Sequence, residues 1–438
     1  MLNFDERTGP ELGVDYPDVT VPDWYRDAKL GVFIHWGIFS VPAWAETHDG
    51  RVAVEEAYAR HRYAEWYGNT VRLPGSPCRS QHVARYGEGT SYEDLADQWH
   101  PEGFDAGELV SAVLRSGARY VVPVTKHHDG FCLWDTATTG FNAARRGPRR
   151  DLIRELAEAT RAAGARFGVY FSGALDWHVS DLPPIQSDRD LFLLRRNDEA
   201  FARYAARQLD ELIERFEPSM LWNDIEWPDG GKGPDDFGVA ALWRRYLAAV
   251  PDGVVNDRWG VPAHGHLTRE YTDVEGVQAE VWESTRGLGM SFGYNAAEGE
   301  AHSLGASELV RYFVDVVAKN GNLLINVGPR ADGSVPELQQ RALDGLGEWL
   351  ATCGEAVFGS RPWRRAGDGQ VRYTVVRGRV FAHLLEPGLG ELRLPEEFLG
   401  AETVRWLGDE AGEVVGGTAR IPDNLRSLPV VVAELGRE

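Results

Sequence analysis

The middle of the chain alternates amphipathic helical patterns with short apolar runs. The segment DLIRELAEATRAAG at 151–164 repeats apolar residues at helical spacing, and ARFGVYFSG at 165–173 follows it directly. The same order recurs in the predicted helix and strand pairs at 107–118 and 119–130, 201–218 and 219–224, 237–253 and 254–259, and 306–321 and 322–328. An apolar run at 29–37 predicts a first strand. Repeated helix–strand units indicate parallel strands joined by crossovers, so the pattern predicts an α/β protein.

The predicted strands carry polar residues at their C-terminal ends. They end on His35-Trp36, on Lys126-His127-His128-Asp129, on Tyr170, on Trp222-Asn223-Asp224 and on Asn256-Asp257-Arg258. A (β/α)8 barrel builds its active site at this end from several strands. An open doubly wound sheet binds ligands around one switch point, and its nucleotide-binding forms need a glycine-rich loop that the sequence lacks. The sequence therefore favours a (β/α)8-type barrel as the catalytic domain.

The pattern changes after about Gly359. Short alternating or β-branched runs then lie between Gly and Pro turns, at 371–388, 390–395, 401–408 and 428–436. Such runs are typical of a small antiparallel domain. The sequence thus predicts a barrel-like catalytic domain over residues 1–355 and a C-terminal antiparallel β-sandwich domain over 356–438. The second domain has no cluster of His and carboxylates, so we expect it to stabilise the barrel.

Composition narrows the classes of function. The 438 residues carry a formal charge of −21, which disfavours nucleic acid as a partner. The polar start of the chain and the absence of a long apolar window predict a cytoplasmic protein without membrane contact. Cys78, Cys132 and Cys353 lie far apart, which argues against a disulfide framework and a clustered zinc site. The 15 tryptophans, several of them beside His, Asp or Glu, suit a ligand that combines hydrocarbon with hydroxyl groups, such as a sugar.

The stretch EPSMLWNDIEWP at 217–228 ends an apolar strand with Asp224 beside two tryptophans. An aspartate considered alone most often caps a helix or forms an ion pair. In these surroundings it also fits the nucleophile of a retaining glycosidase, which needs a second carboxyl group about 5–5.5 Å away. The candidates for this second group are Glu65, Glu226, Glu270, Glu280 and Glu283.

Histidines at the predicted strand ends are candidates for ligand binding. Because side chains alternate along a strand, His127 and His128 could chelate one metal only if the strand has already ended. Two neutral imidazoles at a barrel rim can instead bind separate sugar hydroxyls. His264-Gly265-His266 has the spacing of a metal site and supports a rival hypothesis, a metal-dependent barrel hydrolase. It follows Pro262 in a predicted loop, where exposed or supporting histidines are the better interpretation.

Longer motifs occur along the chain in a specific order. They are WYRDAKLGVFIHWGIFSVPAWAE, EWYGN, VTKHHDGFCLWDT, RRDLIRELAEATRAAGARFGVYFSG, LWNDIEWP, NDRWG, WESTRGLGMSFGYN and GNLLINVGPRADG. Together they resemble the α-L-fucosidases of glycoside hydrolase family 29 over nearly all of about the first 350 residues. The resemblance implies a barrel-like catalytic domain, a C-terminal β domain and a retaining mechanism that uses neither a metal nor another cofactor.

The resemblance also implies a role for each candidate residue. Asp224 of LWND is the implied nucleophile, and Glu270 of LTREY is the implied acid/base, with Glu283 of VWEST as its rival. The other implied site residues contact the sugar or flank the nucleophile: His35, Glu65, Trp66, His127, His128, Tyr170, Trp222, Arg258 and Phe292. Phe292 is placed near the sugar's methyl group, which suits an aromatic ring. Many relatives have glycine directly after the nucleophile, whereas Ile225 follows here, a departure that bears on leaving-group preference.

The implied function is that of a retaining exo-acting α-L-fucosidase. Its substrates would be small fucosylated glycosides or oligosaccharides, cleaved through a covalent glycosyl-enzyme intermediate. A non-catalytic sugar-binding protein is a further alternative, although both candidate carboxylates are present. The sequence leaves open the linkage, the capacity for transglycosylation and the number of subunits, for which a homo-oligomer is one expectation.

Overall fold

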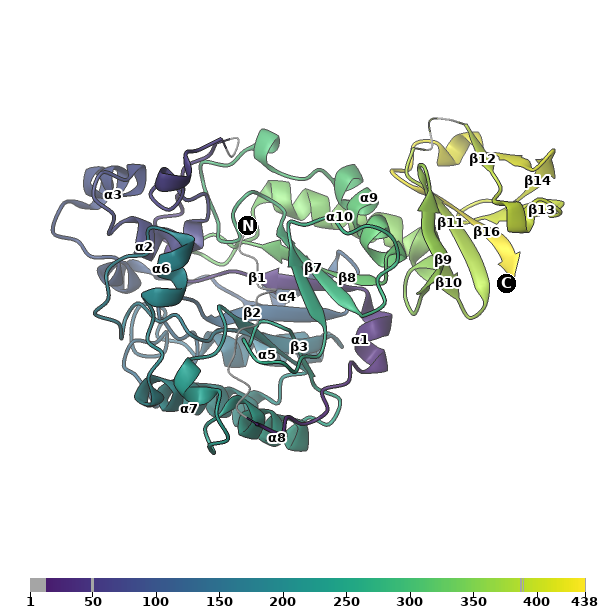
Figure 1. Cartoon of the computed structure of the whole chain (residues 1–438). Coiled ribbons are helices and arrows are strands. Elements are labelled where there is room, and N and C mark those ends of the chain that lie inside the picture. The colour runs from purple at the N-terminus through teal and green to yellow at the C-terminus, as the bar shows by residue number, and fades with distance from the viewer. Residues whose placement is uncertain (1–12, 49–50, 387, 389, 438) are drawn as a thin grey trace.

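The computed structural model describes residues 13–48, 51–386, 388 and 390–437. Its larger part is built on an eight-stranded sheet in the order β5-β4-β3-β2-β1-β8-β7-β6, in which every pairing is parallel. The strands are β1 Leu30–Ile34, β2 Tyr120–Lys126, β3 Arg166–Ser172, β4 Met220–Asp224, β5 Val254–Val255, β6 Leu267–Glu270, β7 Trp282–Gly287 and β8 Gly321–Val327. Strand order and direction confirm the predicted (β/α)8-type barrel (Figure 1).

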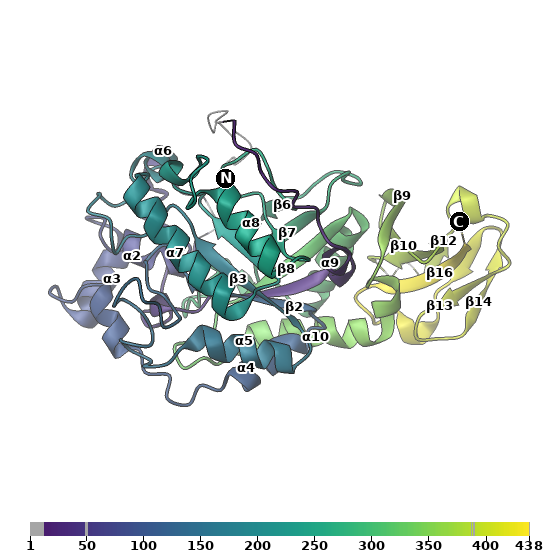
Figure 2. The same ribbon diagram turned by 90° about the horizontal axis from the view of Figure 1, so that it is seen from below.

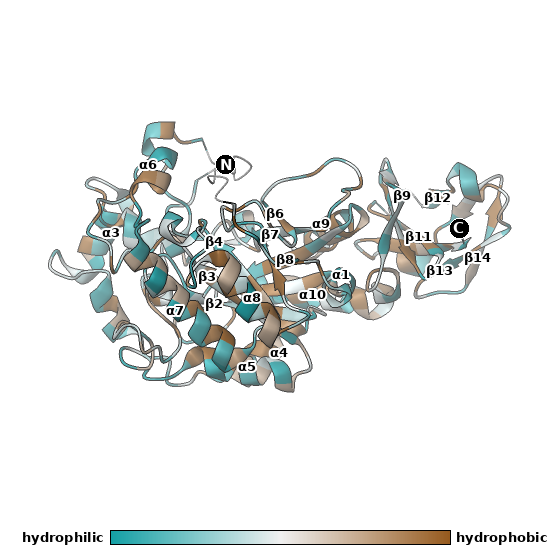
Figure 3. Ribbon diagram, turned by 60° about the horizontal axis from the view of Figure 1, so that its bottom comes forward, coloured by the Kyte–Doolittle hydropathy of each residue, from teal (hydrophilic) through white to brown (hydrophobic). Residues whose placement is uncertain are grey.

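The larger part contains the helices α1 Asp23–Ala28, α2 Tyr67–Thr70, α3 Pro77–Tyr86, α4 Ala106–Leu114, α5 Leu152–Ala162, α6 Asp188–Leu193, α7 Glu199–Phe216, α8 Val239–Ala249, α9 Ala306–Ala318 and α10 Glu337–Cys353. Of these, α4, α5, α7, α8, α9 and α10 lie along the outer face of the sheet (Figure 2), whereas α2, α3 and α6 lie at the end of the barrel away from the sandwich. In α5 the N-cap Asp151 accepts a hydrogen bond from the N–H of Arg154, and Leu152, Ile153 and Leu156 are buried at helical spacing. Figure 3 shows the mixed hydrophobic and hydrophilic surfaces of these outer helices.

The barrel has a seam between its edge strands β5 and β6. A backbone hydrogen bond of 3.2 Å from the N–H of His266 to the carbonyl oxygen of Val255 spans it. In the described part of the chain, no helix lies between β5 and β6 or between β6 and β7. β5 has two residues, so the prediction of a strand over 254–259 is wrong beyond Val255. After Val255 the side chain of Asn256 takes the place of backbone pairing with β4, because it forms hydrogen bonds with both the N–H and the carbonyl oxygen of Asn223.

The C-terminal segment forms a second eight-stranded sheet in the order β12-β15-β14-β13-β16-β11-β10-β9, with antiparallel pairings. Its strands are β9 Arg361–Asp368, β10 Val371–Val376, β11 Arg379–Leu384, β12 Glu391–Arg393, β13 Thr403–Trp406, β14 Ala411–Val415, β15 Thr418–Arg420 and β16 Val431–Arg437. They enclose a core of their own around Trp363, Tyr373 and Trp406. The predicted antiparallel β-sandwich is confirmed, and it lies beside the barrel in Figure 1.

The two parts of the chain share apolar contacts. At the start of the last strand, Val430, which directly precedes β16, and Val432 belong to the apolar cluster of the barrel, whereas Val431 and Ala433 belong to the core of the sandwich. This alternation follows from the two-residue period of a strand. Trp349 of α10 also donates its indole N–H to the carbonyl oxygen of Val430, at 2.8 Å. The sandwich therefore packs directly against the helical layer of the barrel.

Two sequence-level expectations concern the membrane and the cysteines. Within residues 13–48, 51–386 and 390–437, no helix combines the length and the apolar character that a bilayer span requires. Cys78, Cys132 and Cys353 are buried, with free thiols. Burial raises the pKa of the Cys132 thiol well above its ordinary value, so this thiol is protonated at neutral pH.

Candidate active site

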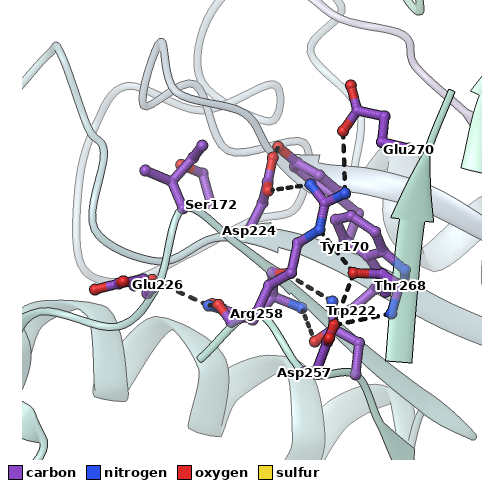
Figure 4. A network of polar contacts seen from close by, with 12 residues as sticks. Tyr170, Ser172, Trp222, Asp224, Glu226, Asp257, Arg258, Thr268 and Glu270 are labelled. Carbon is purple, nitrogen blue, oxygen red and sulfur yellow. Dashed lines mark hydrogen bonds and ion pairs between the residues drawn. The ribbon is translucent and has the colours of Figure 1, made fainter. Parts of the chain in front are cut away.

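Polar residues from several strand ends meet at the C-terminal end of the barrel (Figure 4). Asp224, the last residue of β4, is 8% exposed. Its Oδ2 atom accepts a hydrogen bond of 2.8 Å from the Tyr170 hydroxyl of β3, and its Oδ1 atom accepts one of 3.0 Å from Nη1 of Arg258. The Nε2 atom of His128 lies 3.9 Å from Oδ2. Parallel pairing of the strands places these side chains around one carboxylate.

One guanidinium connects Asp224 to a second carboxylate. Arg258 follows β5, is 4% exposed, and donates from Nη2 to Oε2 of Glu270 at 3.0 Å. Glu270 ends β6, and its Oε1 atom accepts a hydrogen bond of 3.1 Å from the Tyr63 hydroxyl. The Nε atom of Arg258 bonds to Oγ1 of Thr268 at 3.0 Å, which fixes the plane of the guanidinium. Two carboxylates from separate strands therefore bind the two terminal nitrogens of one arginine (Figure 4).

The surroundings keep Asp224 ionised. Burial by itself raises the pKa of this carboxyl group, but the charge of Arg258 and the hydrogen bonds from Tyr170 and Arg258 outweigh burial, and the pKa lies below its ordinary range. Burial and the charge of Asp224 raise the pKa of Tyr170 well above its ordinary value. The tyrosine hydroxyl therefore remains a hydrogen-bond donor. The candidate nucleophile is an anion held by an arginine and a phenol.

Histidines around Asp224 are neutral imidazoles. His35, which follows β1, bonds through Nδ1 to the side-chain oxygen of Asn326 at 2.6 Å, and burial lowers its pKa to about 3. His128 bonds through Nδ1 to the Ser172 hydroxyl at 2.7 Å, and burial lowers its pKa to about 4. Burial also lowers the pKa of His127, whose buried Nδ1 has no hydrogen-bond partner among the described residues. Neutral imidazoles can donate to and accept from hydroxyl groups.

Three rings stack behind the candidate nucleophile. The Tyr170 ring lies 5.5 Å from the His127 ring at an interplanar angle of 6°, and 5.5 Å from the Trp222 ring at 19°. The Arg258 guanidinium lies 4.7 Å from the centre of the Trp222 ring. This stack fixes the tyrosine and the arginine that bind Asp224, because both rest on aromatic faces.

Further aromatic rings extend the site toward the loops. Phe292 is 7% exposed, and its ring lies 5.1 Å from the His35 ring. Trp66 ends the 3-10 helix η3 (Ala64–Trp66), and its ring lies 5.3 Å from the His128 ring. Apolar faces beside hydrogen-bonding groups suit a sugar that carries both hydroxyls and hydrocarbon.

Glu65 is a buried carboxyl group beside these rings. It is 2% exposed, and its Oε2 atom accepts hydrogen bonds from the N–H of Gly293 at 2.7 Å and from the Ser291 hydroxyl at 3.1 Å. Burial, together with the charge of Glu270, raises the pKa of Glu65 to about 7. The group is therefore partly protonated at neutral pH, and it ties the η3 loop to the segment that carries Phe292.

All the predicted site residues belong to this one region of the barrel mouth. They are Asp224, Glu270, His35, Glu65, Trp66, His127, His128, Tyr170, Trp222, Arg258 and Phe292. Their individual roles in binding and catalysis remain predictions.

Glu283, the rival for the acid/base role, lies elsewhere. It is fully buried, and its Oε2 atom accepts hydrogen bonds from the hydroxyls of Tyr25 and Tyr120 at 2.8 and 2.7 Å. Its Oε1 atom accepts one of 2.9 Å from the indole of Trp222 and lies 3.4 Å from Nε2 of His266. Burial raises its pKa, but these partners outweigh burial and the pKa lies below its ordinary range. Glu283 is thus an ionised carboxylate that binds several side chains in the barrel core, beneath Trp222.

The remaining carboxylate candidates form ion pairs away from Asp224. Glu226 binds Arg195 and Lys232, each at 2.9 Å, and Figure 4 shows it apart from the Arg258 pair. The side chain of Glu280 is 60% exposed and lies 3.8 Å from His264. His264 and the buried His266 therefore pair with different glutamates. In the portion of the chain that the structure describes, no group of three His, Cys, Asp or Glu side chains that could hold a metal ion is found.

The sequence did not predict several residues that support the site. Tyr63 bonds Glu270, Asn326 bonds His35, Ser172 bonds His128 and Thr268 bonds Arg258. Ser172 ends β3 and Asn326 lies near the end of β8, so the strand-end rule could have identified them. Tyr63 and Thr268 carry no such signal, because their importance depends on which loop and strand fold beside Arg258.

Comparison with known proteins assigns the chain to a family. The family model described as "Alpha-L-fucosidase" matches residues 15–355. The chain belongs to the α-L-fucosidase family, glycoside hydrolase family 29. It is 31% identical over 379 residues to an α-L-fucosidase of Dictyostelium discoideum, covering 84% of this chain and 78% of the relative. It is 30% identical over 407 residues to human tissue α-L-fucosidase, covering 87% and 80%.

A solved structure supports the assignment to the α-L-fucosidase family. The α-fucosidase of Thermotoga maritima matches with a TM-score of 0.85 at 43% sequence identity, covering 95% of this chain and 97% of that chain. The match includes the C-terminal part as well as the barrel, since it covers nearly the whole chain. This member of the α-L-fucosidase family is accordingly a glycoside hydrolase.

In this family member, the residue after the candidate nucleophile has an unusual backbone conformation. Ile225 has a φ of 56° and Glu226 a φ of 61°, a left-handed region in which a β-branched residue is strained and glycine is not. Contacts hold the turn in place: Arg195 donates to the carbonyl oxygen of Ile225 at 3.2 Å, and Arg195 and Lys232 bind the Glu226 carboxylate. The Ile225 side chain is 4% exposed and shares an apolar cluster with Trp66.

Substitutions at Ile225 test this conformation in the fucosidase-family enzyme. We expect Ile225→Gly to lower the free energy of unfolding by about 2 kcal/mol, because the lost apolar burial (about 2–5 kcal/mol) exceeds the relieved left-handed strain (about 1–2 kcal/mol). Ile225→Ala should be more destabilising, although alanine is larger than glycine, because it loses the packing and keeps the strain. Urea unfolding measures the free energy of unfolding of both variants. An alanine variant that is more stable than the glycine variant would contradict the prediction.

Glu283 provides a second stability test. We expect Glu283→Gln to lower the free energy of unfolding by about 1–3 kcal/mol at pH 7, because an amide cannot replace every hydrogen bond of the buried carboxylate. The folded-state pKa of Glu283 is lowered, so its stabilisation is present above the unfolded pKa of about 4.3 and is lost as pH falls through the folded value. Unfolding curves at decreasing pH should therefore converge for wild type and variant. Glu280→Gln, at an exposed position, serves as the control and should resemble wild type throughout.

Proposed function

We propose that the protein is a retaining, exo-acting α-L-fucosidase whose nucleophile is Asp224 and whose acid/base is Glu270. The observation that carries the proposal is the binding of both carboxylates by one guanidinium, that of Arg258, at the barrel mouth. A retaining mechanism needs two carboxyl groups close enough to act on one anomeric carbon from two sides. Glu283, buried under Trp222, is not available to a sugar in this way.

In the first step, Asp224 attacks the anomeric carbon while Glu270 gives a proton to the departing oxygen. The glycosidic bond breaks as an ester bond to Asp224 forms, so the positive charge that develops on the sugar is met by a carboxylate. Arg258 and Tyr170 keep Asp224 ionised before the attack. Glu270 acts here as the general acid, because the departing oxygen needs a proton as the glycosidic bond breaks.

In the second step, water attacks the ester and Glu270 accepts its proton. The enzyme returns to its starting state, and the sugar leaves with its original anomeric configuration. The side chain of Asp224 is 12% exposed and that of Glu270 is 29% exposed. The nucleophile thus lies deeper than the acid/base, which suits cleavage of a terminal sugar whose leaving group remains nearer to solvent.

Recognition of fucose is assigned to the neutral histidines and the aromatic rings. His127 offers a buried nitrogen that has no hydrogen-bond partner within the described residues, and this nitrogen can hydrogen-bond a hydroxyl group. Phe292 presents an apolar ring beside His35, where a 6-deoxy sugar would place its methyl group. A structure of the Thermotoga maritima relative is described as a complex with fucose, and it matches this chain with a TM-score of 0.85 at 42% identity.

Hydrolysis of p-nitrophenyl α-L-fucoside, followed by proton NMR, tests the proposal directly. The α anomer of fucose should appear first and mutarotate afterwards. Initial formation of the β anomer, or no turnover at all, would overturn the proposal. The matching α-L-galactoside, which replaces the methyl group by a hydroxymethyl group, should react about 10–200-fold more slowly, because one such group is worth about 1–3 kcal/mol.

Arg258 controls the ionisation of the nucleophile in this mechanism. We expect Arg258→Met to raise the pKa of Asp224, because burial then acts on the carboxylate without its main positive partner. Asp224 must be ionised to attack, so activity is lost as pH falls through its pKa, and the acidic limb of the kcat/KM profile should move to higher pH. The pH dependence of kcat/KM for wild type and variant measures the shift. An unchanged acidic limb would show that Arg258 does not set this pKa.

The cytoplasmic location and the homo-oligomer are also proposals. Fractionation of the source cells tests the location, and light scattering after gel filtration tests the number of subunits.

A further inference from the structure

A second cavity of about 390 Å³ lies outside the candidate active site. It is placed between α2, α3 and the loops around residues 88–93 and 177–178, in the part of the barrel farthest from the C-terminal sandwich (Figure 1). The lining residues that matter for its chemistry are Arg72, Arg79, Glu88, Tyr92, Asp129 and Trp177. Its volume lies within the range of about 300–1,000 Å³ that small-molecule sites occupy.

The cavity and the active site share a wall. Gly68 lines the cavity two residues after Trp66, and Asp129 lines it directly after His128. Trp177 also lines the cavity, and its ring lies 5.4 Å from the Trp66 ring and 5.7 Å from the His128 ring. The same segments therefore present one set of side chains to Asp224 and another set to the cavity.

The lining combines aromatic rings with polar groups, as sugar sites do. The Asp129 carboxyl group is 4% exposed, and it accepts a hydrogen bond of 2.7 Å from the Tyr92 hydroxyl. Arg79 and Glu88 are exposed, and their side chains have no hydrogen bond or ion pair with any other described residue, so both can bind a ligand. Trp177 and Tyr92 supply flat rings against which a pyranose can pack.

The lining carries basic and acidic side chains in similar number, which favours a neutral ligand. Arg72, Arg79 and His178 line the cavity together with Glu88, Glu93 and Asp129, and Nδ1 of His178 lies 2.8 Å from Oε1 of Glu93. A phosphate or a polyanion would need an excess of cations, and a cationic ligand an excess of carboxylates. A neutral saccharide instead uses donors and acceptors of both kinds, since each hydroxyl group both donates and accepts.

We propose that this cavity is a second saccharide-binding site, which takes one or two neutral sugar residues. The sugar has two sources, the non-fucose part of a substrate whose fucose occupies the active site, or a separate glycan. Binding can be measured without turnover, so the proposal does not depend on the hydrolytic function. Because Trp177 contacts both Trp66 and His128, occupancy of the cavity would also stabilise the wall of the active site.

Isothermal titration with lactose and with N-acetyllactosamine tests the site. The full chain is first saturated with L-fucose, so that the active site is occupied, and the disaccharide is then added. Val83→Trp fills the cavity from the surface of α3, where Val83 is 37% exposed, and Arg79→Ala removes a free donor. Arg341→Ala, at an exposed arginine of α10, is the matched control. We expect saturable binding to wild type and control, and at least about tenfold weaker binding to both cavity variants.

Kinetics then separate the two sources of sugar. If the substrate itself reaches the cavity, Val83→Trp should raise KM for a fucosylated oligosaccharide and leave KM for the aryl fucoside unchanged. If a separate glycan binds, both KM values stay unchanged while disaccharide binding is lost. The proposal is overturned if neither disaccharide gives saturable binding, or if Val83→Trp and Arg79→Ala bind as tightly as wild type. Thermal unfolding of the variants shows that a lost signal does not reflect a lost fold.

Discussion

Replacement of Asp224 by alanine is expected to lower kcat/KM for an aryl α-L-fucoside on the order of 10³-fold or more. The reason is chemical, because without the carboxylate no covalent intermediate forms and no anion faces the developing charge on the sugar. The fold should be retained, since Arg258 keeps Glu270 as a partner when Asp224 is removed. Steady-state kinetics and thermal unfolding, measured on the same preparation, separate the two effects.

Azide makes this prediction specific to the nucleophile. In the alanine variant, azide can enter the space of the missing carboxylate and attack the sugar from that side, giving a fucosyl azide of inverted β configuration. Asp236→Ala, an exposed aspartate in the loop that follows β4, is the matched control and should keep the wild-type rate without any response to azide. Near-normal activity of the Asp224 variant would refute the role of this residue.

Replacement of Glu270 by alanine is expected to have the second largest effect. General acid–base catalysis contributes about 10²–10⁴-fold, so kcat/KM for a fucosylated oligosaccharide should fall by that factor. Aryl fucosides should lose less, because a nitrophenolate leaves without a proton. Comparison of the two substrate classes measures the protonation step, and equal losses on both would contradict the assignment.

Azide again distinguishes the roles, with the opposite stereochemistry. In the Glu270 variant, Asp224 still forms the ester, and azide then replaces it to give a fucosyl azide of retained α configuration. Glu283→Gln is the control, because Glu283 lies in the barrel core and its loss should change stability without any azide response. An azide response at Glu283 and none at Glu270 would reverse the assignment.

Much of the fold follows from local patterns along the chain. The helix and strand alternation between 107 and 224 corresponds closely to α4, β2, α5, β3, α7 and β4, because these strands are buried on both faces and their helices carry one apolar stripe. The pattern did not reveal β6 and β7. They contain LTRE and WESTRG, polar sequences that are stable as strands because Arg258, Glu283 and their partners hold them inside the barrel.

The sequence predicted which residues form the candidate site better than it predicted how these residues are arranged. The strand-end residues His35, His127, Tyr170 and Asp224 carry a signal, because parallel strands place their C-terminal ends on one side of the sheet. The sequence around Glu270 carries no such signal, because no helix separates β6 from β5. Which strand lies beside β6 across the seam is decided only when the barrel closes.

The sequence by itself determined the class of fold, the group of residues at the strand ends and, through its ordered motifs, the enzyme family. These depend on local periodicity and on the identity of side chains, both of which can be read along the chain. Only the tertiary structure decided that Arg258 binds Asp224 and Glu270, that Glu283 supports the core, and that a second cavity lies behind Trp66 and His128. Such decisions depend on distances between segments that are far apart in sequence, and these distances exist only once the barrel has closed.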